Sequence, residues 1–248
     1  MIHIQGLSFG RIIHSIDLDV IKGEMVGIVG RNGAGKSTLL KSILLFHHGV
    51  SGEVILNNQD FRQISRNEIA RCVSYIPQSF QVDFDIPVME FLFTARYTYN
   101  ENRRLSHIRI QEAAEACGTE ALLHRSMRVL SGGEMQKVLL TSAVVQDTPV
   151  WLCDEPTSSL DPRAEAEFFQ LLSLIRRDRP LTVLIVSHNL PELLIRCSRI
   201  IALKDGEIAF DAPTEHYSAS VLEQIFGIPF CLVSAGKRIL LVPGEVEQ

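Results

Sequence analysis

Short apolar runs separated by turn residues dominate the first third of the chain. Most of these runs alternate apolar with polar residues, as half-buried strands do, and one is continuously apolar. The turn at Gly10 and Arg11 predicts antiparallel pairing of the first two strands, and Asn57-Asn58 predicts a hairpin turn. Residues 38–46 read as an apolar helix. The predicted strands are 2–9, 16–20, 25–29, 53–56 and 71–76.

The pattern changes over residues 78–129. This segment is rich in helix formers and predicts helices at 88–97 and 108–117, with a polar break at 100–104 and a stop at Gly118. Strands and helices alternate after it, which predicts parallel strands joined by crossover helices. The expected helices are 131–145, 162–176 and 190–197, and the expected strands are 150–153, 182–186 and 200–203.

The C-terminal part has a third pattern. A short helix is expected at 221–226, followed by two apolar runs, 230–233 and 239–242. The polar and glycine-containing residues 234–237 join these runs, which predicts a terminal hairpin.

The composition limits the class of protein. With 248 residues and 46% apolar content the chain can bury a large core, and the net charge of −5 with scattered Lys and Arg argues against nucleic-acid binding. The five cysteines are far apart and without a C-x-x-C pair, which fits free thiols in a reducing cytosol. The N-terminus lacks a secretion signal and no stretch of eighteen apolar residues occurs. We therefore expect a chain that is neither secreted nor membrane-spanning.

The stretch GRNGAGKST, residues 30–38, directly follows the continuously apolar strand. It satisfies G-x-x-x-x-G-K-[ST], with Gly30, Gly35, Lys36 and Ser37 in the fixed places. Glycines let backbone N–H groups approach a polyphosphate, Lys36 adds a positive charge, and the next helix offers unpaired N–H groups. The Ser37 hydroxyl can ligate Mg²⁺. The pattern predicts a nucleotide-binding loop rather than an ordinary glycine turn.

Residues 150–155, VWLCDE, combine a buried strand with two adjacent carboxylates at its end. Ligands of open α/β sheets bind at the carboxyl ends of strands, so these acids are placed where the phosphates would be. Because neighbouring side chains of a strand point apart, we expect Asp154 to face a magnesium ion and Glu155 to reach a water beside the terminal phosphate. The alternative is a solvated acidic strand end before Pro156.

A second helix start has the features of an anion site. Ser131-Gly132-Gly133-Glu134 precedes an apolar run, so Ser131 and Glu134 form the pattern of a capping box. The two glycines also bare the N–H groups so that an anion can come close. Both interpretations can hold. One nucleotide does not need both helix ends from a single subunit.

At this point the chain resembles the ATP-binding cassette (ABC) ATPases over residues 2–212. In that family the L-S-G-G motif, here residues 130–133, completes the nucleotide site of the opposite subunit in a head-to-tail dimer. The resemblance implies an α/β P-loop NTPase fold with a mixed core sheet, an antiparallel β edge subdomain and an α-helical insert. The implied parts are an ABC ATPase domain at 1–212, its catalytic core at 1–77 and 130–212, its helical subdomain at about 78–129, and an extension at 213–248.

The resemblance also implies a role for each motif. Residues 30–38 look like the Walker A motif and 150–155 like Walker B. The implied catalytic residues are Glu155, His188, Gln78 and Lys36. The implied nucleotide-binding residues are Phe9, Gly30, Asn32, Gly33, Gly35, Lys36, Ser37, Thr38, Ser131, Gly132, Gly133 and Asp161, and the implied magnesium ligands are Ser37, Gln78 and Asp154.

Three of these assignments rest on short motifs. Gln78 in YIPQS is similar to the Q-loop glutamine, which touches magnesium and the attacking water. His188 in VSHN is similar to the switch histidine that hydrogen-bonds the terminal phosphate. Ser159-Leu160-Asp161 matches the D-loop, although S-x-D before a proline is also a plain helix N-terminus.

The sequence departs from the family pattern at two positions. The family usually stacks adenine on a tyrosine, whereas the candidate here is Phe9, which retains a π face but lacks the phenol. Met135 follows LSGGE where polar residues are frequent, which should alter the helix surface more than the phosphate contacts.

The implied reaction is hydrolysis of ATP to ADP and phosphate in a homodimer that bound ATP holds together. A single cassette resembles the ATPases of bacterial importers, which dock on transmembrane permease subunits at the cytoplasmic face of the cell membrane and work with a separate substrate-binding protein. The tail LEQIFGIPFCLV resembles ATPases for iron-siderophore, haem and cobalamin uptake, which makes metal-chelate import the expected function.

Other members of the family remain alternatives. The stretch VDFDIPV is also similar to zinc and manganese importers, and a soluble ABC ATPase of iron-sulfur cluster assembly shares every catalytic motif. A DNA-repair ATPase is disfavoured, because the 131 − 36 = 95 positions between Lys36 and Ser131 leave no room for its long coiled coil.

Overall fold

The computed structural model describes residues 2–158, 160–235 and 238–244. The chain forms two compact units. The first unit consists of residues 1–63 and 184–248, and the second of residues 64–183. The boundary between them falls inside strand β8 (Thr182–Val186).

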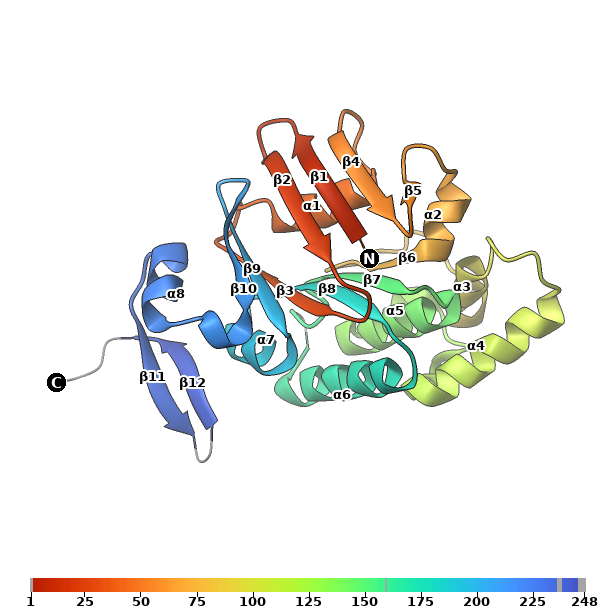
Figure 1. The fold of residues 1–248 in the computed structure, drawn as a ribbon. Coiled ribbons are helices and arrows are strands. Elements are labelled where there is room, and N and C mark those ends of the chain that lie inside the picture. Colours follow the sequence, from red (N-terminus) through yellow and green to blue (C-terminus); the bar gives the residue numbers. More distant parts are fainter. Residues whose placement is uncertain (1, 159, 236–237, 245–248) are drawn as a thin grey trace. The chain divides into compact units, whose positions relative to one another are not determined.

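An antiparallel sheet opens the first unit, as the alternating pattern predicts. Its strand order is β2-β1-β4-β5, and helix α1 (Lys36–Ile43) lies alongside it (Figure 1). Its strands are β1 (Ile2–Phe9), β2 (Ile13–Val20), β4 (Ser51–Leu56) and β5 (Gln59–Asp60). Asn57 and Asn58 adopt left-handed φ values of 51° and 64°, which confirms the predicted hairpin turn.

The second sheet of the first unit is mixed. Its strands run in the order β10-β9-β3-β8, with β3 parallel to β9 and β9 antiparallel to β10. They include β3 (Met25–Val29), β9 (Arg199–Lys204) and β10 (Glu207–Pro213). The sequence pattern did not predict β10, because its side chains are exposed or half-buried and form no apolar run.

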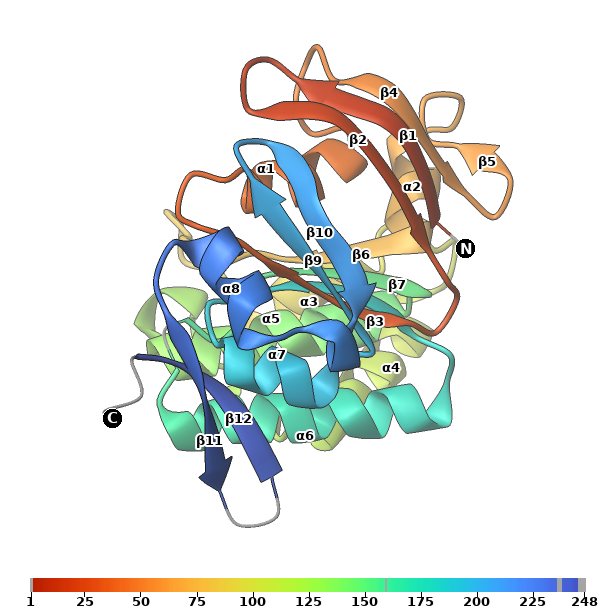
Figure 2. The same ribbon diagram turned by 60° about the vertical axis from the view of Figure 1, so that its left-hand side comes forward.

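The remaining elements of this unit lie toward the C-terminus. Helix α7 (Leu190–Arg196) packs against β3, and a short 3₁₀ turn, η3 (Thr214–His216), precedes helix α8 (Ala219–Phe226). Strands β11 (Phe230–Ala235) and β12 (Arg238–Pro243) pair antiparallel beside α8, which confirms the expected hairpin (Figure 2). Residues 236–237 of its predicted connection lie outside the described residues.

Helix α1 is shorter than the predicted 38–46. The N–H of Phe46 donates to the carbonyl of Lys41 and that of Leu45 to Ser42, with Leu45 in the left-handed region at φ 53°. This is a Schellman motif, which ends a helix by turning its last carbonyls inward. The prediction was wrong here because apolar periodicity continues past the point where the backbone reverses.

In the second unit, β6 (Val73–Ile76) pairs parallel with β7 (Val150–Asp154). The predicted strand 71–76 was wrong in its first two residues, because helix α2 (Arg66–Cys72) continues to Cys72. Ser65 and Glu68 form a capping box at its start, a sequence signal that a search for apolar runs does not detect in this polar stretch.

Helices make up the rest of the second unit. They are α3 (Val88–Ala95), α4 (Arg103–Cys117), α5 (Gly132–Gln146) and α6 (Pro162–Asp178), with 3₁₀ turns η1 (Glu120–Leu122) and η2 (Met127–Val129). Helices α3 and α4 both pack on α5 (Figure 1). Their shared apolar core includes Val88, Leu92, Ile110, Met127 and Val138. Helix α4 starts earlier than the predicted 108 because Asn102 caps it.

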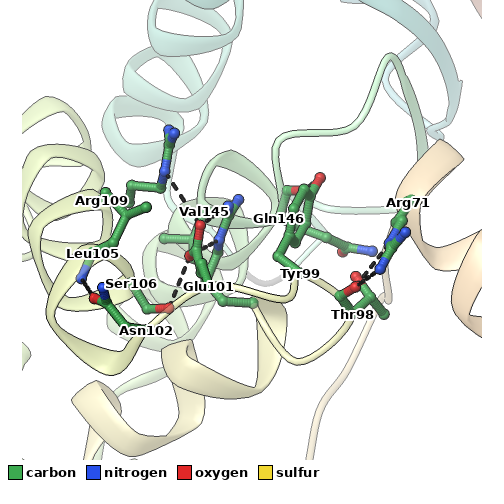
Figure 3. A network of polar contacts seen from close by, with 11 residues as sticks. Arg71, Thr98, Tyr99, Glu101, Asn102, Leu105, Ser106, Arg109, Val145 and Gln146 are labelled. Carbon is green, nitrogen blue, oxygen red and sulfur yellow. Dashed lines mark hydrogen bonds and ion pairs between the residues drawn. The ribbon is translucent and has the colours of Figure 1, made fainter.

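A buried arginine ties the loop between α3 and α4 to the end of α5. Arg96 binds Glu101 through two hydrogen bonds of 2.7 and 2.8 Å and donates to the carbonyl of Val145 at 2.9 Å. Its guanidinium lies 3.6 Å from the ring centre of Tyr99. The hydroxyl of Tyr99 donates to the carbonyl of Gln146, and Figure 3 labels both residues together with Glu101 and Val145. The hydrogen bonds from Arg96 hold the pKa of Glu101 below its ordinary value, so Arg96 and Glu101 are both charged at neutral pH.

We predict that Arg96→Met lowers the free energy of unfolding by about 2–3 kcal/mol, because it leaves the largely covered Glu101 carboxylate, which is 11% exposed, without its main partner. Arg103→Met is the matched control. Arg103 pairs with Glu90, but these side chains are 70% and 46% exposed, so its loss should cost less than about 1 kcal/mol. Urea unfolding followed by circular dichroism measures both. Equal losses in the two variants would contradict the prediction.

None of the helices in the described part of the chain has the length and apolar character needed to span a bilayer.

Candidate nucleotide site

The glycine-rich loop lies between β3 and α1 in the first unit. Gly30, Gly33 and Gly35 have positive φ values of 147°, 82° and 96°. A Cβ atom on Gly30 would lie 2.3 Å from the carbonyl oxygen of Leu203, and one on Gly35 would lie 2.8 Å from the side chain of Ile13. The turn therefore depends on glycine for close packing as well as for backbone conformation.

The start of α1 fits an anion. Gly35 is the N-cap residue and makes no side-chain cap hydrogen bond, so no cap side chain stands between an anion and the start of the helix. Lys36 is 6% exposed, and its ammonium donates to the carbonyls of Gly30 at 2.9 Å and Arg31 at 3.2 Å. Its charge is thus held against the loop. Ser37 and Thr38 are half-buried in the first helical turn, whereas Asn32 is exposed in the loop.

We predict that Gly30→Ala lowers the free energy of unfolding by about 2–3 kcal/mol, because the new methyl group meets backbone. Gly33→Ala is the control. Gly33 also has a positive φ, but nothing lies within 4 Å of its Cβ position, so only about 1 kcal/mol should be lost. Thermal unfolding of both variants measures the difference. A milder effect at Gly30 than at Gly33 would contradict the geometry.

An acidic group lies at the end of β7 in the second unit. Asp154 is 2% exposed and ends the strand, and Glu155 is 9% exposed. Glu155 has a left-handed φ of 49°, a conformation that costs free energy for a residue with a Cβ atom. The sequence argument assigned the two side chains to different directions because they alternate along a strand. Strand alternation does not explain the direction of Glu155, because β7 ends at Asp154. The left-handed backbone of Glu155 sets the direction of its side chain instead.

Tyr75 of the neighbouring strand β6, and Gln78 just beyond the end of that strand, contact these carboxylates. The hydroxyl of Tyr75 donates to Oδ2 of Asp154 at 2.8 Å, and Nε2 of Gln78 donates to Oε2 of Glu155 at 2.8 Å. Parallel pairing of β6 with β7 brings both donors to the carboxyl end of β7. Burial and the nearby Asp154 charge raise the pKa of Tyr75, so the phenol keeps its proton. Sequence reasoning missed Tyr75, although its position three residues before Gln78 on an adjacent strand was the available signal.

The predicted capping box at the start of α5 is present. Ser131 Oγ accepts from the N–H of Glu134 at 3.3 Å, and Glu134 Oε2 accepts from the N–H of Ser131 at 2.8 Å. Arg125 binds the other Glu134 oxygen at 2.5 Å. Hydrogen bonds from Ser131, followed by Arg125, lower the pKa of Glu134, so its charge is retained at neutral pH. Gly132 and Gly133 form the first turn, where the predicted anion contact remains a prediction.

Three further predicted residues lie on separate elements. Asp161 caps α6 by accepting from the N–H of Ala164 at 2.8 Å, which confirms the helix N-terminus, while Ser159 lies outside the described residues. His188 is exposed and lies two residues after the end of β8, in the first unit. Phe9 stacks on the ring of His47, with centroids 4.4 Å apart and planes 16° apart, so one face of its ring already has a partner.

The structure thus groups the predicted residues within each unit. The first unit holds the glycine loop and Lys36, together with Phe9 and His188. The second unit joins Gln78 to Glu155 by a hydrogen bond and adds Tyr75 to Asp154. A glycine loop between a buried strand and an uncapped helix, in a chain with mixed sheets, defines the class of P-loop nucleotide-binding proteins.

Comparison with known proteins narrows this class. The ABC transporter family profile matches residues 13–158, more than half of the chain. The chain is 30% identical over 229 residues to the ferric enterobactin transport ATP-binding protein FepC of Escherichia coli (strain K12), which covers 90% of this chain and 84% of that protein. It is 32% identical over 217 residues to the zinc import ATP-binding protein ZnuC of Halorhodospira halophila, which covers 87% and 77%.

Solved structures show the same fold. One, described as the inward-facing conformation of an ABC transporter assigned provisionally to the metal-chelate type, matches with a TM-score of 0.84 at 22% identity and covers 98% of this chain and 97% of that chain. The dimeric bacterial ABC transporter cassette MJ0796 matches with a TM-score of 0.77 at 24% identity and covers 88% and 100%.

This chain belongs to the ABC transporter family. It is an ABC ATPase that binds ATP and hydrolyses it to drive transport. Cassettes of this family dimerise and join permease subunits. The α/β fold with a mixed sheet and an antiparallel β subdomain agrees with the sequence prediction.

Proposed function

We propose that this chain is the ATPase of a bacterial importer that takes up a metal chelate, namely an iron-siderophore, haem or cobalamin. The observation that carries the proposal is the set of relatives named for iron chelates. These relatives are FepC, a petrobactin import protein of Bacillus anthracis at 29% identity, and an iron(3+)-hydroxamate import protein of Bacillus subtilis at 30% identity. Their alignments cover 90%, 94% and 90% of this chain, so the likeness is not confined to the motifs.

We infer that the two groups of residues described above bind the nucleotide. The loop N–H groups, with Lys36, would hold the phosphates, and Phe9 would offer the ring face opposite His47 to adenine. The loop residues with this role are Gly30, Asn32, Gly33, Gly35, Lys36, Ser37 and Thr38. Ser131, Gly132 and Gly133 would complete the site of the partner subunit in a homodimer, as the L-S-G-G motif does in the family, and Asp161 would also contact nucleotide.

The proposed metal ligands fit Mg²⁺. Ser37, Gln78 and Asp154 offer a hydroxyl, an amide and a carboxylate oxygen, the hard donors that this ion prefers. Asp154 is 2% exposed, and a carboxylate so deeply buried favours a nearby cation. When bound, Mg²⁺ would neutralise phosphate charge.

Hydrolysis requires a group that can accept a proton from water. Glu155 would take this role, with its carboxylate oriented by the Gln78 amide at 2.8 Å. His188 would bind the terminal phosphate. ATP binding would then close the dimer, and hydrolysis would release it to drive permease subunits fed by a substrate-binding protein on the other side of the membrane.

A zinc or manganese importer is the second candidate. The relative ZnuC, at 32% identity, favours it specifically. A soluble ATPase of iron-sulfur cluster assembly stays a prediction from shared motifs only.

Purification of the tagged chain with its membrane partners tests the proposal. We expect a permease to copurify. In proteoliposomes, the ATPase activity of that complex should rise when the matching substrate-binding protein carries a ferric siderophore, haem or cobalamin. Stimulation by the zinc-loaded or manganese-loaded protein alone would establish the second candidate instead. Copurification with scaffold proteins and no permease would contradict both importers.

A further inference from the structure

A buried glutamine on α5 lies next to the acidic group of the second unit. Gln136 is 3% exposed, and its Nε2 donates to the main-chain carbonyl of Gln78 at 3.1 Å. The side chain of Gln78 in turn donates to Glu155 at 2.8 Å. Two hydrogen bonds therefore connect α5 to Glu155, the proton acceptor of the proposed function on which this inference rests.

The oxygen atom of the Gln136 amide takes no part in these hydrogen bonds. Its Oε1 is buried, and it has no hydrogen-bond partner among the described residues. A buried acceptor without a partner destabilises the folded state, whereas an apolar side chain of the same length would avoid this cost. Gln136 is therefore a poor choice for stability alone, and its bond to Gln78 is the contribution that an apolar residue could not make.

The position of Gln136 on its helix adds to this argument. It lies in the second turn of α5, whose first turn contains Gly132 and Gly133 and whose cap is Ser131. A helix moves as a rigid body over so short a distance. The segment that carries the serine-glycine motif thus also holds the backbone of Gln78.

We propose that Gln136 is a positioning residue for ATP hydrolysis. It fixes the main chain of Gln78, so that the Gln78 amide stays on Glu155 and the carboxylate keeps the orientation in which it can accept a proton from water. Gln136 thus acts through Gln78. The inference concerns the ATPase reaction and is independent of the cargo proposed above.

Gln136→Met tests this role, because methionine has similar length and is apolar. We expect kcat to fall about three- to tenfold, as the loss of one hydrogen bond predicts, with the KM for ATP unchanged within about twofold. The midpoint of thermal unfolding should stay the same or rise by up to about 4 °C, because the unpartnered oxygen is removed. If Gln136 only packed in the core, the substitution would not lower kcat while leaving the unfolding midpoint unchanged or higher.

Gln146→Met is the matched control, with the same substitution on the same helix. The half-buried Gln146 donates to the carbonyls of Ala70 at 2.6 Å and Val73 at 3.3 Å, away from the carboxylates. This variant should lower the unfolding midpoint by about 2–6 °C and change kcat less than about twofold.

A double-mutant cycle with Gln78→Ala separates positioning from other effects. If Gln136 acts through Gln78, Gln136→Met should have no further effect on kcat once the Gln78 side chain is absent. An equal fall in kcat in both backgrounds, or an unchanged kcat in the single variant, would overturn the proposal. Gln136→Glu provides a second variant should methionine not fold, because a carboxylate cannot donate to the Gln78 carbonyl, and its kcat should fall in the same Gln78-dependent way.

The assay is hydrolysis of MgATP by the purified chain, with its permease where the two copurify. No chelate and no substrate-binding protein is added. A wrong cargo assignment would therefore leave the result unchanged, whereas a failed cycle would count only against Gln136.

Discussion

Glu155→Gln is expected to lower kcat for ATP hydrolysis about a thousandfold while ATP binding is retained. The amide has the same shape as the carboxylate but cannot accept a proton from water. The contacts of the loop and of Lys36 lie in the other unit and are not altered. In the variant, ATP that closes the dimer is not consumed, so the dimer should accumulate.

Phosphate release and size-exclusion chromatography with ATP measure the two effects. Glu167→Gln is the control, because Glu167 is a 40% exposed carboxylate that pairs with Lys137 on the surface of α5 and α6. The kcat of the Glu167→Gln variant should stay within about twofold of the kcat of the unmodified chain. A Glu155→Gln variant that hydrolyses ATP at the unmodified rate would exclude Glu155 as the proton acceptor.

The glycine loop and the strand before it were predictable because local sequence determines both. Gly30 and Gly35 occupy backbone conformations and packing positions that exclude a Cβ atom. The presence of glycine at these positions in the sequence therefore indicates the geometry of the loop. The buried strand ending at Asp154 was predictable for a similar reason, since a continuous apolar run before two acids has few other solutions.

The contacts of Tyr75 and Gln136 could not be predicted in the same way. Tyr75 reads as an ordinary strand residue, and only the parallel pairing of β6 with β7 places its hydroxyl on Asp154. Gln136 reads as one polar residue in an apolar helix. Its contact with Gln78 joins positions 58 residues apart, and no local pattern reports such a distance.

The errors in secondary structure have a common cause. Apolar periodicity predicts which face of a segment is buried, but capping and edge pairing decide where the segment ends. Leu45 ends α1 by adopting a left-handed conformation within an apolar run. Ser65 starts α2 inside a stretch that reads as polar, and β10 has no apolar run because it lies at the end of its sheet.

Lys36→Met is expected to weaken ATP binding by about two to three orders of magnitude. The ammonium group is held at the loop by the carbonyls of Gly30 and Arg31, so its charge is already in place for the phosphates. Methionine keeps the length of the side chain and removes the charge. Loss of one partner from a buried charge pair typically costs this much affinity.

Two measurements separate this binding effect from damage to the loop. Isothermal titration with ATP gives the affinity, and thermal unfolding reports whether the loop tolerates the loss of two hydrogen bonds. Lys41→Met, on the last turn of the same helix, removes an identical charge away from the glycines and should leave the affinity unchanged within about twofold. If both variants bind ATP equally well, the phosphates do not lie against Lys36, and the nucleotide site must be placed elsewhere in the chain.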